Sequence, residues 1–507
     1  MTEHTESHAE AGTPTHPVLG DSVRTSHVFQ GPTGPLEYTA VAGKMIVHEE
    51  VFTDGTAQGI RPAAEVFVTA LTLDGADPGT RPVTFAFNGG PGSPTLWLQF
   101  GLFGPRLIDS GDVDSPTPAP YRMLDNPDSL LADSDLVFID PMTTGYSRAA
   151  EGAKPDTWHG YSGDRDLVGE AIRLWTTENQ RWFSPKFLAG ESYGTTRAAE
   201  LSGYLMERHG MTFNGLILIS SILDFGTVFF TEGNDEPYIQ YLPTYAATAH
   251  YHGKHPGKTL HEVVAEADAY AQNEYRIALA RGNRMSEAET RQVAERVAEL
   301  TGLRVEYVIQ SELRLEHERF FTELLREEGR SVGRLDSRFT GHPGRLNQEA
   351  QRLDPALLFI LQAYSPAANH YFRAELGYET PLSYEIMYGR VMPWSYREFE
   401  NASVTSADQL ALAMRANPDL KVYVANGFYD GATPFAAAEH VFAHLRIPRE
   451  RAAQDIITYY YEAGHMMYVH EPSRIAQSQH IRDFVAWACG ADKPVVPAEH
   501  TAAGAAA

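Results

Sequence analysis

Cysteine, basic charge and long apolar runs are all scarce in this sequence of 507 residues. Cys489 is its one cysteine, so a disulfide within the chain is excluded, and a reducing compartment fits this composition. The 41 basic residues are outnumbered by 66 acidic ones, which gives a formal net charge of −25 at pH 7. Because nucleic acids and anionic membranes are bound by basic surfaces, we expect neither as a partner.

Apolar stretches that would cross a membrane or direct export are also missing. No run reaches about 18 apolar residues, the length that spans a bilayer. The first residues, MTEHTESHAEAGTPTHP, are polar, so we expect no secretory signal peptide and a cytoplasmic location. The composition leaves the oligomeric state open.

The chain does contain enough apolar material for a sizeable core, since 43% of its residues are hydrophobic and 11% aromatic. Short apolar runs that predict strands alternate with helical stretches such as 166–182 and 195–210. The runs show little polar alternation, as expected for strands covered on both faces. They are EVFVTALTL (65–73), VTFAF (83–87), DLVFID (135–140), KFLAG (186–190), LILIS (216–220), KVYVANG (421–427) and DIITYYY (455–461). This alternation predicts an α/β fold with a mostly parallel central sheet flanked by helices.

A helical block interrupts the alternation. Residues 261–282, 286–300 and 318–329 have helical spacing, and Ser286 followed by Glu289 predicts a capping box. We therefore divide the chain into a flexible leader (1–34), a first core part (35–225), a helical cap insertion (226–400), a second core part (401–490) and a flexible tail (491–507). A large insertion explains why the chain is long for one domain.

A nucleophile motif stands where a predicted strand meets a predicted helix. Residues 190–194 read Gly-Glu-Ser-Tyr-Gly, the G-x-S-x-G pattern of the α/β-hydrolase fold. At such a turn the Ser192 hydroxyl stands clear of the backbone, and the helix N-terminus favours a developing negative charge. The pattern alone is weak, and the alternative is a serine that caps an ordinary helix.

Two later segments supply the partners that a serine nucleophile needs. Asp430 follows the strand at 421–427, and His465 follows the strand at 455–461. In this fold the order along the chain is serine, acid, histidine, each after its own strand. We therefore predict a catalytic triad with Ser192 as nucleophile, His465 as general base and Asp430 as the acid that orients the imidazole.

A glycine-rich turn follows the strand at 83–87. Residues 88–92 read Asn-Gly-Gly-Pro-Gly, at the place where the fold requires a second oxyanion donor. We predict that the backbone N–H groups of Gly90 and Tyr193 form the oxyanion hole. The alternative is a tight turn without a chemical role.

Taken together, these segments resemble the serine carboxypeptidase family, which includes carboxypeptidase Y and cathepsin A, and the details look more like its bacterial members. The resemblance implies the triad and oxyanion residues already named. It also implies that Asn88 and Glu191 bind the terminal carboxylate of a peptide substrate. The residues that carry it are NGGPG (88–92), NPDS (126–129), DLVFIDPMTTGYS (135–147), GESYG (190–194), NGFYDGATP (426–434) and EAGHMMY (462–468).

The carboxylate pair has a physical consequence. A substrate carboxylate repels an ionised Glu191, so this side chain should be protonated when it binds, which predicts a raised pKa and better peptidase activity in acid. The sequence also departs from the family. Where relatives often carry a supporting glutamate, a gap-free count places Leu102, and Ser93 stands where a cysteine often follows NGGPG.

The sequence thus predicts a serine-type carboxypeptidase that hydrolyses the C-terminal peptide bond of peptides through an acyl-enzyme, with no cofactor and no metal. An esterase or acyltransferase that uses the same residues is the alternative, and a binding protein with an idle fold is a third possibility. Trp97, Tyr146 and Trp394 are candidates for apolar pocket lining, although a core position suits them equally well.

Overall fold

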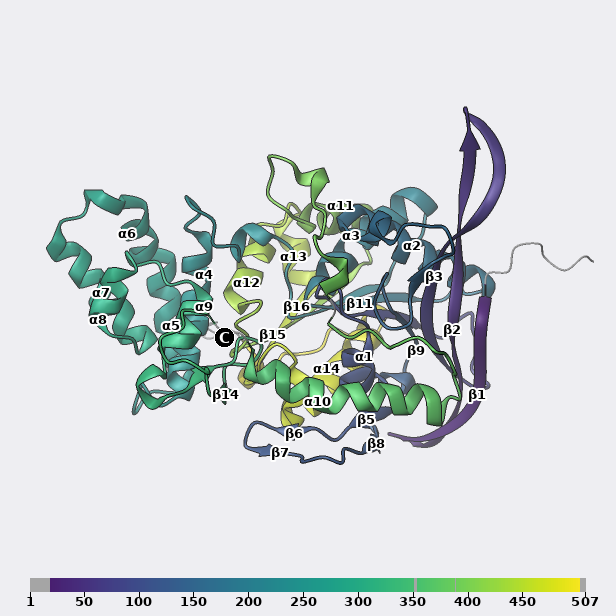
Figure 1. Cartoon of the computed structure of the whole chain (residues 1–507), viewed down its shortest axis with the longest axis horizontal. Helices are drawn as coiled ribbons and strands as arrows, with labels where there is room; N and C mark the ends of the chain where they lie inside the picture. The colour runs from purple at the N-terminus through teal and green to yellow at the C-terminus, as the bar shows by residue number, and fades with distance from the viewer. Residues whose placement is uncertain (1–18, 351–352, 388, 502–507) are drawn as a thin grey trace, which may run out of the picture.

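The computed structural model describes residues 19–350, 353–387 and 389–501, and its centre is a ten-stranded mixed sheet (Figure 1). The strand order is β1-β2-β3-β9-β4-β11-β12-β15-β16, and the short β10 pairs with β3. β1 to β3 and β9 pair antiparallel, whereas β9, β4, β11, β12, β15 and β16 run parallel. The strands are β1 (Leu19–Gly31), β2 (Gly34–Thr53), β3 (Thr56–Leu73), β4 (Val83–Phe87), β9 (Asp135–Ile139), β10 (Arg148–Ala149), β11 (Lys186–Glu191), β12 (Gly215–Ile219), β15 (Lys421–Gly427) and β16 (Ile456–Tyr461).

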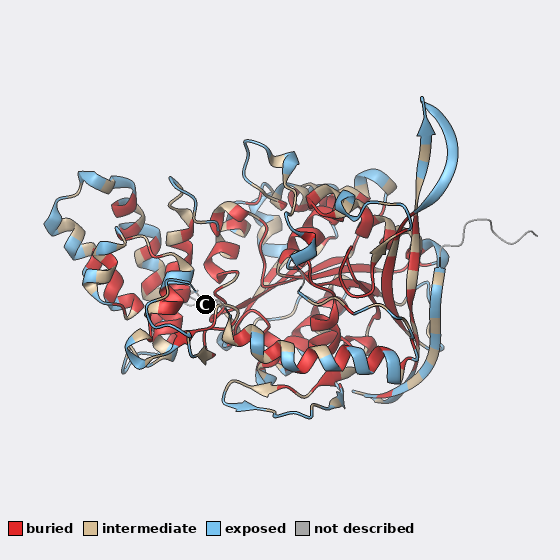
Figure 2. Cartoon of the chain, in the orientation of Figure 1, coloured by how far each residue is buried: buried red, intermediate tan, exposed pale blue. Residues whose placement is uncertain are grey.

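Both faces of the parallel half are covered, which explains its continuous apolar runs. Neighbouring residues on a strand face opposite cores: Phe187 packs in one cluster and Leu188 in the other, and Ile217 and Leu216 divide in the same way. Figure 2 shows this sheet as the buried centre of the molecule. One face is covered by α2 (Tyr161–Glu178), α3 (Tyr193–His209) and α11 (Ala407–Ala416), and the other by α10 (Pro355–His370) and α14 (Glu471–Ala488).

A separate group of helices lies at the end of the molecule opposite β1 (Figure 1). These helices enclose their own core, which includes Tyr245, Val297 and Phe320. The predicted capping box is confirmed, since Ser286 caps the helix and Glu289 returns the bond to the cap backbone. The group comprises α4 (Glu236–Tyr251), α5 (Leu260–Tyr270), α6 (Arg276–Arg281), α7 (Glu287–Thr301), α8 (Val305–Gln310) and α9 (His317–Glu323).

The segment boundaries drawn from the sequence need three corrections. First, α10 belongs to the main core rather than to a cap over 226–400, because Ala363, Tyr364 and Ala367 pack in the same cluster as the sheet. Second, the expected leader is wrong over residues 19–31, which form β1; residues 1–18 lie outside the described residues.

Third, the expected flexible tail is wrong where it packs on the sheet. His500 Nδ1 lies 2.8 Å from the backbone oxygen of Tyr460, and its ring lies beside His480. Residues 502–507 lie outside the described part of the chain. Within the described residues, no helix combines the length and the apolar character that crossing a membrane demands.

Candidate active site

The turn between β11 and α3 holds Ser192 in a conformation that side chains rarely adopt. Its φ is 61° and its ψ −129°, outside the regions that a non-glycine residue favours. The flanking glycines make this turn possible by their lack of a side chain. A Cβ on Gly190 would lie 2.0 Å from the Gly194 oxygen, and one on Gly194 would lie 2.6 Å from the Phe87 oxygen. The local sequence therefore permits the close packing around the strained serine.

Asp430 and His465 meet beyond the ends of two adjacent strands, β15 and β16. His465 Nδ1 lies 2.8 Å from Asp430 Oδ2, and Asp430 is fully buried. The same carboxylate accepts hydrogen bonds from the backbone N–H groups of Ala432 and Thr433, at 2.8 and 2.9 Å, and from the Thr433 hydroxyl at 2.7 Å. These donors fix the orientation of the acid.

The charge of Asp430 controls the proton affinity of the imidazole. Burial alone would lower the pKa of His465, but the Asp430 carboxylate offsets this effect and the pKa is raised above its usual value. The backbone of His465 is also held in place by two hydrogen bonds. The His465 N–H donates to the Leu335 oxygen at 2.6 Å, and the Ser220 hydroxyl donates to the His465 oxygen at 2.6 Å.

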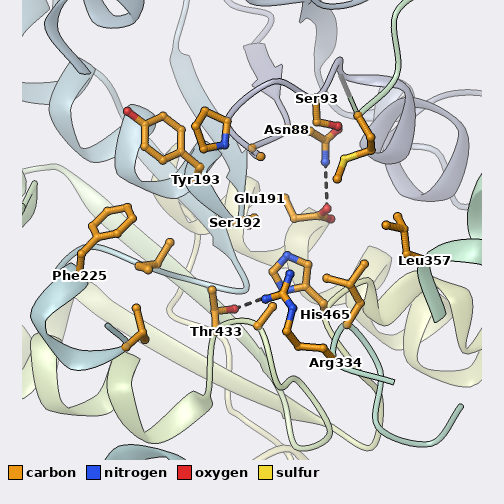
Figure 3. Close-up of a pocket in the computed structure, with 18 of the residues that line it drawn as sticks. Asn88, Ser93, Glu191, Ser192, Tyr193, Phe225, Arg334, Leu357, Thr433 and His465 are labelled. Atoms are coloured by element: carbon orange, nitrogen blue, oxygen red, sulfur yellow. Dashed lines mark hydrogen bonds between the residues drawn. The ribbon is translucent and has the colours of Figure 1, made fainter. Parts of the chain in front are cut away.

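Ser192 and His465 line one pocket with a volume of about 520 Å³, shown in Figure 3. Four more of the predicted site residues line it too: Asn88, Gly90, Glu191 and Tyr193. Six of the seven predicted site residues therefore border the same space. Asp430 lies behind His465, as expected for an orienting acid. The structure thus brings together residues that are up to 377 positions apart in the sequence, from Asn88 to His465.

The glycine-rich turn after β4 lies against the nucleophile turn. A Cβ on Gly89 would lie 2.4 Å from the Tyr193 nitrogen, and Gly90 has a φ of 109°, which favours glycine. Arg197 fixes the turn from α3, because its Nη1 donates to the Asn88 oxygen at 2.7 Å. The first N–H groups of a helix have no partner within the helix, so that of Tyr193 is available to a ligand.

Asn88 and Glu191 form a buried polar pair at one end of the pocket. Asn88 Nδ2 donates to Glu191 Oε1 at 2.9 Å, and Asn88 Oδ1 accepts the Leu98 N–H at 3.2 Å (Figure 3). Glu191 is 3% exposed, and its Oε2 has no hydrogen-bond partner among the described residues. Burial raises the pKa of Glu191 to about 7, although the positive charge on His465 opposes this rise.

Tyr468 is a neighbour of Glu191 that the sequence analysis did not single out. Its hydroxyl is buried without a hydrogen-bond partner in the described structure, and burial followed by the Glu191 charge raises its pKa well above the usual value. A Cβ on Gly101 would meet the Tyr468 ring at 2.4 Å, so the glycine makes room for it. Leu102, which a gap-free count aligns with a glutamate that relatives often carry, packs in the core. The signal in the sequence was the EAGHMMY motif, of which Tyr468 is the last residue.

The pocket wall comes from two different cores. Tyr193, Phe225, Tyr241 and Trp394 belong to the aromatic side, which continues into the helical group. The other side, next to Asn88 and Glu191, belongs to the core around the sheet and is lined by Trp97, Leu335, Leu357, Ile360 and Met466.

Two of the three aromatic residues suggested as lining occupy the pocket. Trp97 donates its ring N–H to Ser93 at 2.6 Å, and Trp394 donates its own to the Tyr193 hydroxyl at 3.2 Å. Tyr146 is fully buried in a cluster with Phe67 and is not among the lining residues. Arg334 and His317 also line the pocket, and no motif marks either of them in the sequence.

Comparisons with known proteins agree with this geometry. A family model described as serine carboxypeptidase matches residues 67–477. The structure is similar to Kex1(delta)p, a prohormone-processing carboxypeptidase from Saccharomyces cerevisiae, with 12% identity, a TM-score of 0.51, and coverage of 89% of this chain and 91% of that chain. No curated protein matches the sequence.

Two other solved structures are more remote. One is a haloalkane dehalogenase loop variant from Bradyrhizobium elkanii, at 13% identity, a TM-score of 0.31, and coverage of 87% of this chain and 97% of that one. The other is juvenile hormone epoxide hydrolase from the silkworm Bombyx mori, at 11% identity, a TM-score of 0.35, and coverage of 89% and 79%. The predicted α/β-hydrolase fold is confirmed by the sheet and by the Kex1(delta)p match.

Proposed function

This chain belongs to the serine carboxypeptidase family, and we propose that it removes the C-terminal residue of peptides through an acyl-enzyme formed on Ser192. The observation that carries this assignment is the 2.8 Å contact between His465 Nδ1 and the buried Asp430 carboxylate, in a pocket that the strained Ser192 also lines. With Nδ1 engaged, Nε2 is the imidazole nitrogen available to the serine hydroxyl.

The proposed reaction proceeds in two halves. His465 Nε2 takes the Ser192 proton as the serine oxygen attacks the last peptide carbonyl, and the resulting oxyanion is stabilised by the N–H groups of Gly90 and Tyr193. The imidazolium then protonates the leaving amino acid. Water, deprotonated by the same imidazole, hydrolyses the acyl-enzyme and regenerates the hydroxyl. Asp430 holds the ring and stabilises its positive charge.

The Asn88–Glu191 pair supports a carboxypeptidase over the esterase or acyltransferase alternative. Both side chains are buried beside the nucleophile, where the free carboxylate of the leaving residue would lie. A neutral Glu191 can donate its proton to that carboxylate, and Asn88 supplies an amide N–H. A simple ester has no carboxylate at this position and gains nothing from the pair.

Hydrolysis of the blocked dipeptide Z-Phe-Leu is the direct test. Wild-type protein should release free leucine, and Ser192→Ala should reduce the rate by roughly 10⁴-fold or more while the chain stays folded. An absence of leucine release, together with rapid cleavage of a simple ester, would exclude the peptidase assignment in favour of the alternative. Peptides as partners and the cytoplasmic location are further parts of this proposal, and cell fractionation tests the second.

A further inference from the structure

Arg334 brings a positive charge into the wall of the catalytic pocket. It lies between β13 (Ser331–Val332) and β14 (Thr340–Gly341), on a segment tied to both catalytic loops. The Arg334 oxygen accepts the Gly431 N–H at 2.9 Å, and the next oxygen, that of Leu335, accepts the His465 N–H. Figure 3 shows the Arg334 side chain directed toward His465. A guanidinium is therefore held at a fixed place beside the reacting groups.

The guanidinium of Arg334 has no ion pair or hydrogen bond to any residue that the structure describes. Arg338, four positions later, instead pairs with Asp336 at 2.6 Å. Burial raises the pKa of Asp354 and the Arg334 charge opposes this rise, but the two side chains do not form an ion pair. The two carboxylate oxygens of Asp354 instead accept hydrogen bonds from the N–H groups of Ala356 and Leu335, at 2.9 Å each. Arg334 thus keeps all its donors available, and a planar guanidinium matches a carboxylate with two parallel hydrogen bonds.

The Arg334 charge lies close to residues of the aromatic side of the pocket. The Arg334 charge acts on Tyr241 and His317, which line the aromatic side of the pocket, and also on His465. Burial, followed by the Arg334 charge, lowers the pKa of His317 to about 4, so this histidine is neutral and adds no charge of its own near neutral pH. Because the proposed function assigns the terminal carboxylate to Asn88 and Glu191, a ligand carboxylate at Arg334 would be a second one.

We propose that Arg334 binds the side-chain carboxylate of a glutamate or aspartate at the penultimate position of the peptide, and so sets a preference for acidic residues there. The proposal rests on the carboxypeptidase function. If the leaving residue places its carboxylate on Asn88 and Glu191, the residue that acylates Ser192 extends to the opposite, aromatic side, where Arg334 lies.

Matched pairs of substrates and variants test this assignment. Z-Glu-Leu and Z-Gln-Leu differ by one charge at the penultimate residue, and Z-Leu-Glu and Z-Leu-Gln differ at the leaving residue. Each is assayed with wild type, Arg334→Gln and Arg334→Glu. Arg345→Gln is the control. Arg345 is exposed and does not line the pocket, and its substitution changes the net charge by the same amount as Arg334→Gln. Z-Phe-Leu reports the basal peptidase activity.

We expect wild type and Arg345→Gln to favour Z-Glu-Leu over Z-Gln-Leu in kcat/KM by about ten- to a hundredfold, the range of a charge-assisted hydrogen bond. Arg334→Gln should cleave Z-Glu-Leu and Z-Gln-Leu with about equal kcat/KM while it still cleaves Z-Phe-Leu. Arg334→Glu should prefer Z-Lys-Leu to Z-Glu-Leu. An unchanged Glu/Gln ratio in Arg334→Gln, or a charge effect confined to the leaving residue, would overturn the inference. Failure of wild type to release the C-terminal residue from any of these peptides would instead refute the carboxypeptidase function itself.

Discussion

Ser220 and His465 are joined by a hydrogen bond that crosses from one strand end to another: the Ser220 hydroxyl donates to the His465 backbone oxygen at 2.6 Å. Ser220 directly follows β12, the strand beside the one that ends at the nucleophile turn, and its φ is 52°. The Ser192 N–H donates to the oxygen of Ile219, the last residue of β12, at 3.0 Å, so the end of β12 contacts both the nucleophile turn and the loop that carries the proposed base.

Ser220→Ala should lower kcat for Z-Phe-Leu by about fivefold with little change in KM, since a lost buried hydrogen bond costs about 1 kcal/mol and the histidine loop becomes less ordered. Steady-state kinetics measures this. Ser221→Ala is the matched control, because the Ser221 hydroxyl is buried one residue later without a hydrogen-bond partner among the described residues. Equal losses in the two variants would show that the Ser220 bond does not position His465.

Asp430→Asn should reduce kcat by about 10⁴-fold without unfolding the chain. The asparagine oxygen can still accept the N–H groups of Ala432 and Thr433, but the amide would face His465 Nδ1 with a donor and favour the wrong imidazole tautomer. Thr433→Val removes only the hydroxyl that donates to Asp430 Oδ2 and should show a loss of about tenfold or less. A mild Asp430→Asn phenotype would contradict the role assigned to the acid.

Glu191 gives the reaction a pH dependence whose sign follows from its pKa of about 7. Below that pH the side chain is neutral and accommodates a terminal carboxylate, so kcat/KM for peptides should decline as the pH rises through about 7. His465 must be unprotonated to act as the base, and its raised pKa sets the decline on the acid side. Peptide hydrolysis should therefore follow a bell-shaped profile.

Two comparisons isolate the Glu191 contribution. Cleavage of a simple ester by wild type should keep the acid-side decline and lose the alkaline one, because no carboxylate has to be bound. Glu191→Gln cannot ionise, so its peptide profile should stay flat above pH 7. Persistence of the same alkaline decline in Glu191→Gln would assign that titration to another group.

The proximity of Ser192, Asp430 and His465 was predictable from the sequence because each of them follows a strand of mostly apolar, buried residues. The runs at 83–87 and 421–427 coincide with β4 and β15, since central parallel strands are buried on both faces and have no polar alternation to confuse their ends. β1 was missed for the opposite reason. It is an edge strand with mostly exposed or half-exposed side chains, and its sequence, LGDSVRTSHVFQG, resembles a loop.

Residues that act by position rather than by motif could not be found in this way. Arg334 lies in a segment without a recognised motif. Its place beside His465 depends on the tertiary hydrogen bonds that the Arg334 and Leu335 oxygens accept from the Gly431 and His465 N–H groups. Tyr468 lies within a recognised motif, yet its contact with Glu191 depends on the space left by Gly101. The α10 helix has the same periodicity as the cap helices, so only packing separates it from them.

Arg197 forms a buried ion pair and also holds the turn that carries Gly90, so its loss should affect both stability and catalysis. It forms a buried ion pair with Asp164, with 2.6 Å between Nε and Oδ2 and side chains only 0% and 3% exposed. Arg197→Met leaves Asp164 charged and without its partner, so the free energy of unfolding should fall by about 3–5 kcal/mol. Because Arg197 also donates to the Asn88 oxygen, the turn that carries Gly90 loses an anchor and kcat should fall as well.

Urea unfolding and Z-Phe-Leu kinetics measure the two effects, and Arg173→Met is the comparison. Arg173 pairs with Glu170 at 2.6 Å, a similar distance, but both side chains are nearly 30% exposed, so this loss should cost no more than about 1 kcal/mol. The double variant Arg197→Met/Asp164→Leu removes both buried charges and should recover much of the stability, since a matched apolar pair avoids the desolvation cost. It should not recover kcat, because the Asn88 oxygen still lacks its donor. Recovery of both properties would mean that Arg197 affects catalysis only through stability.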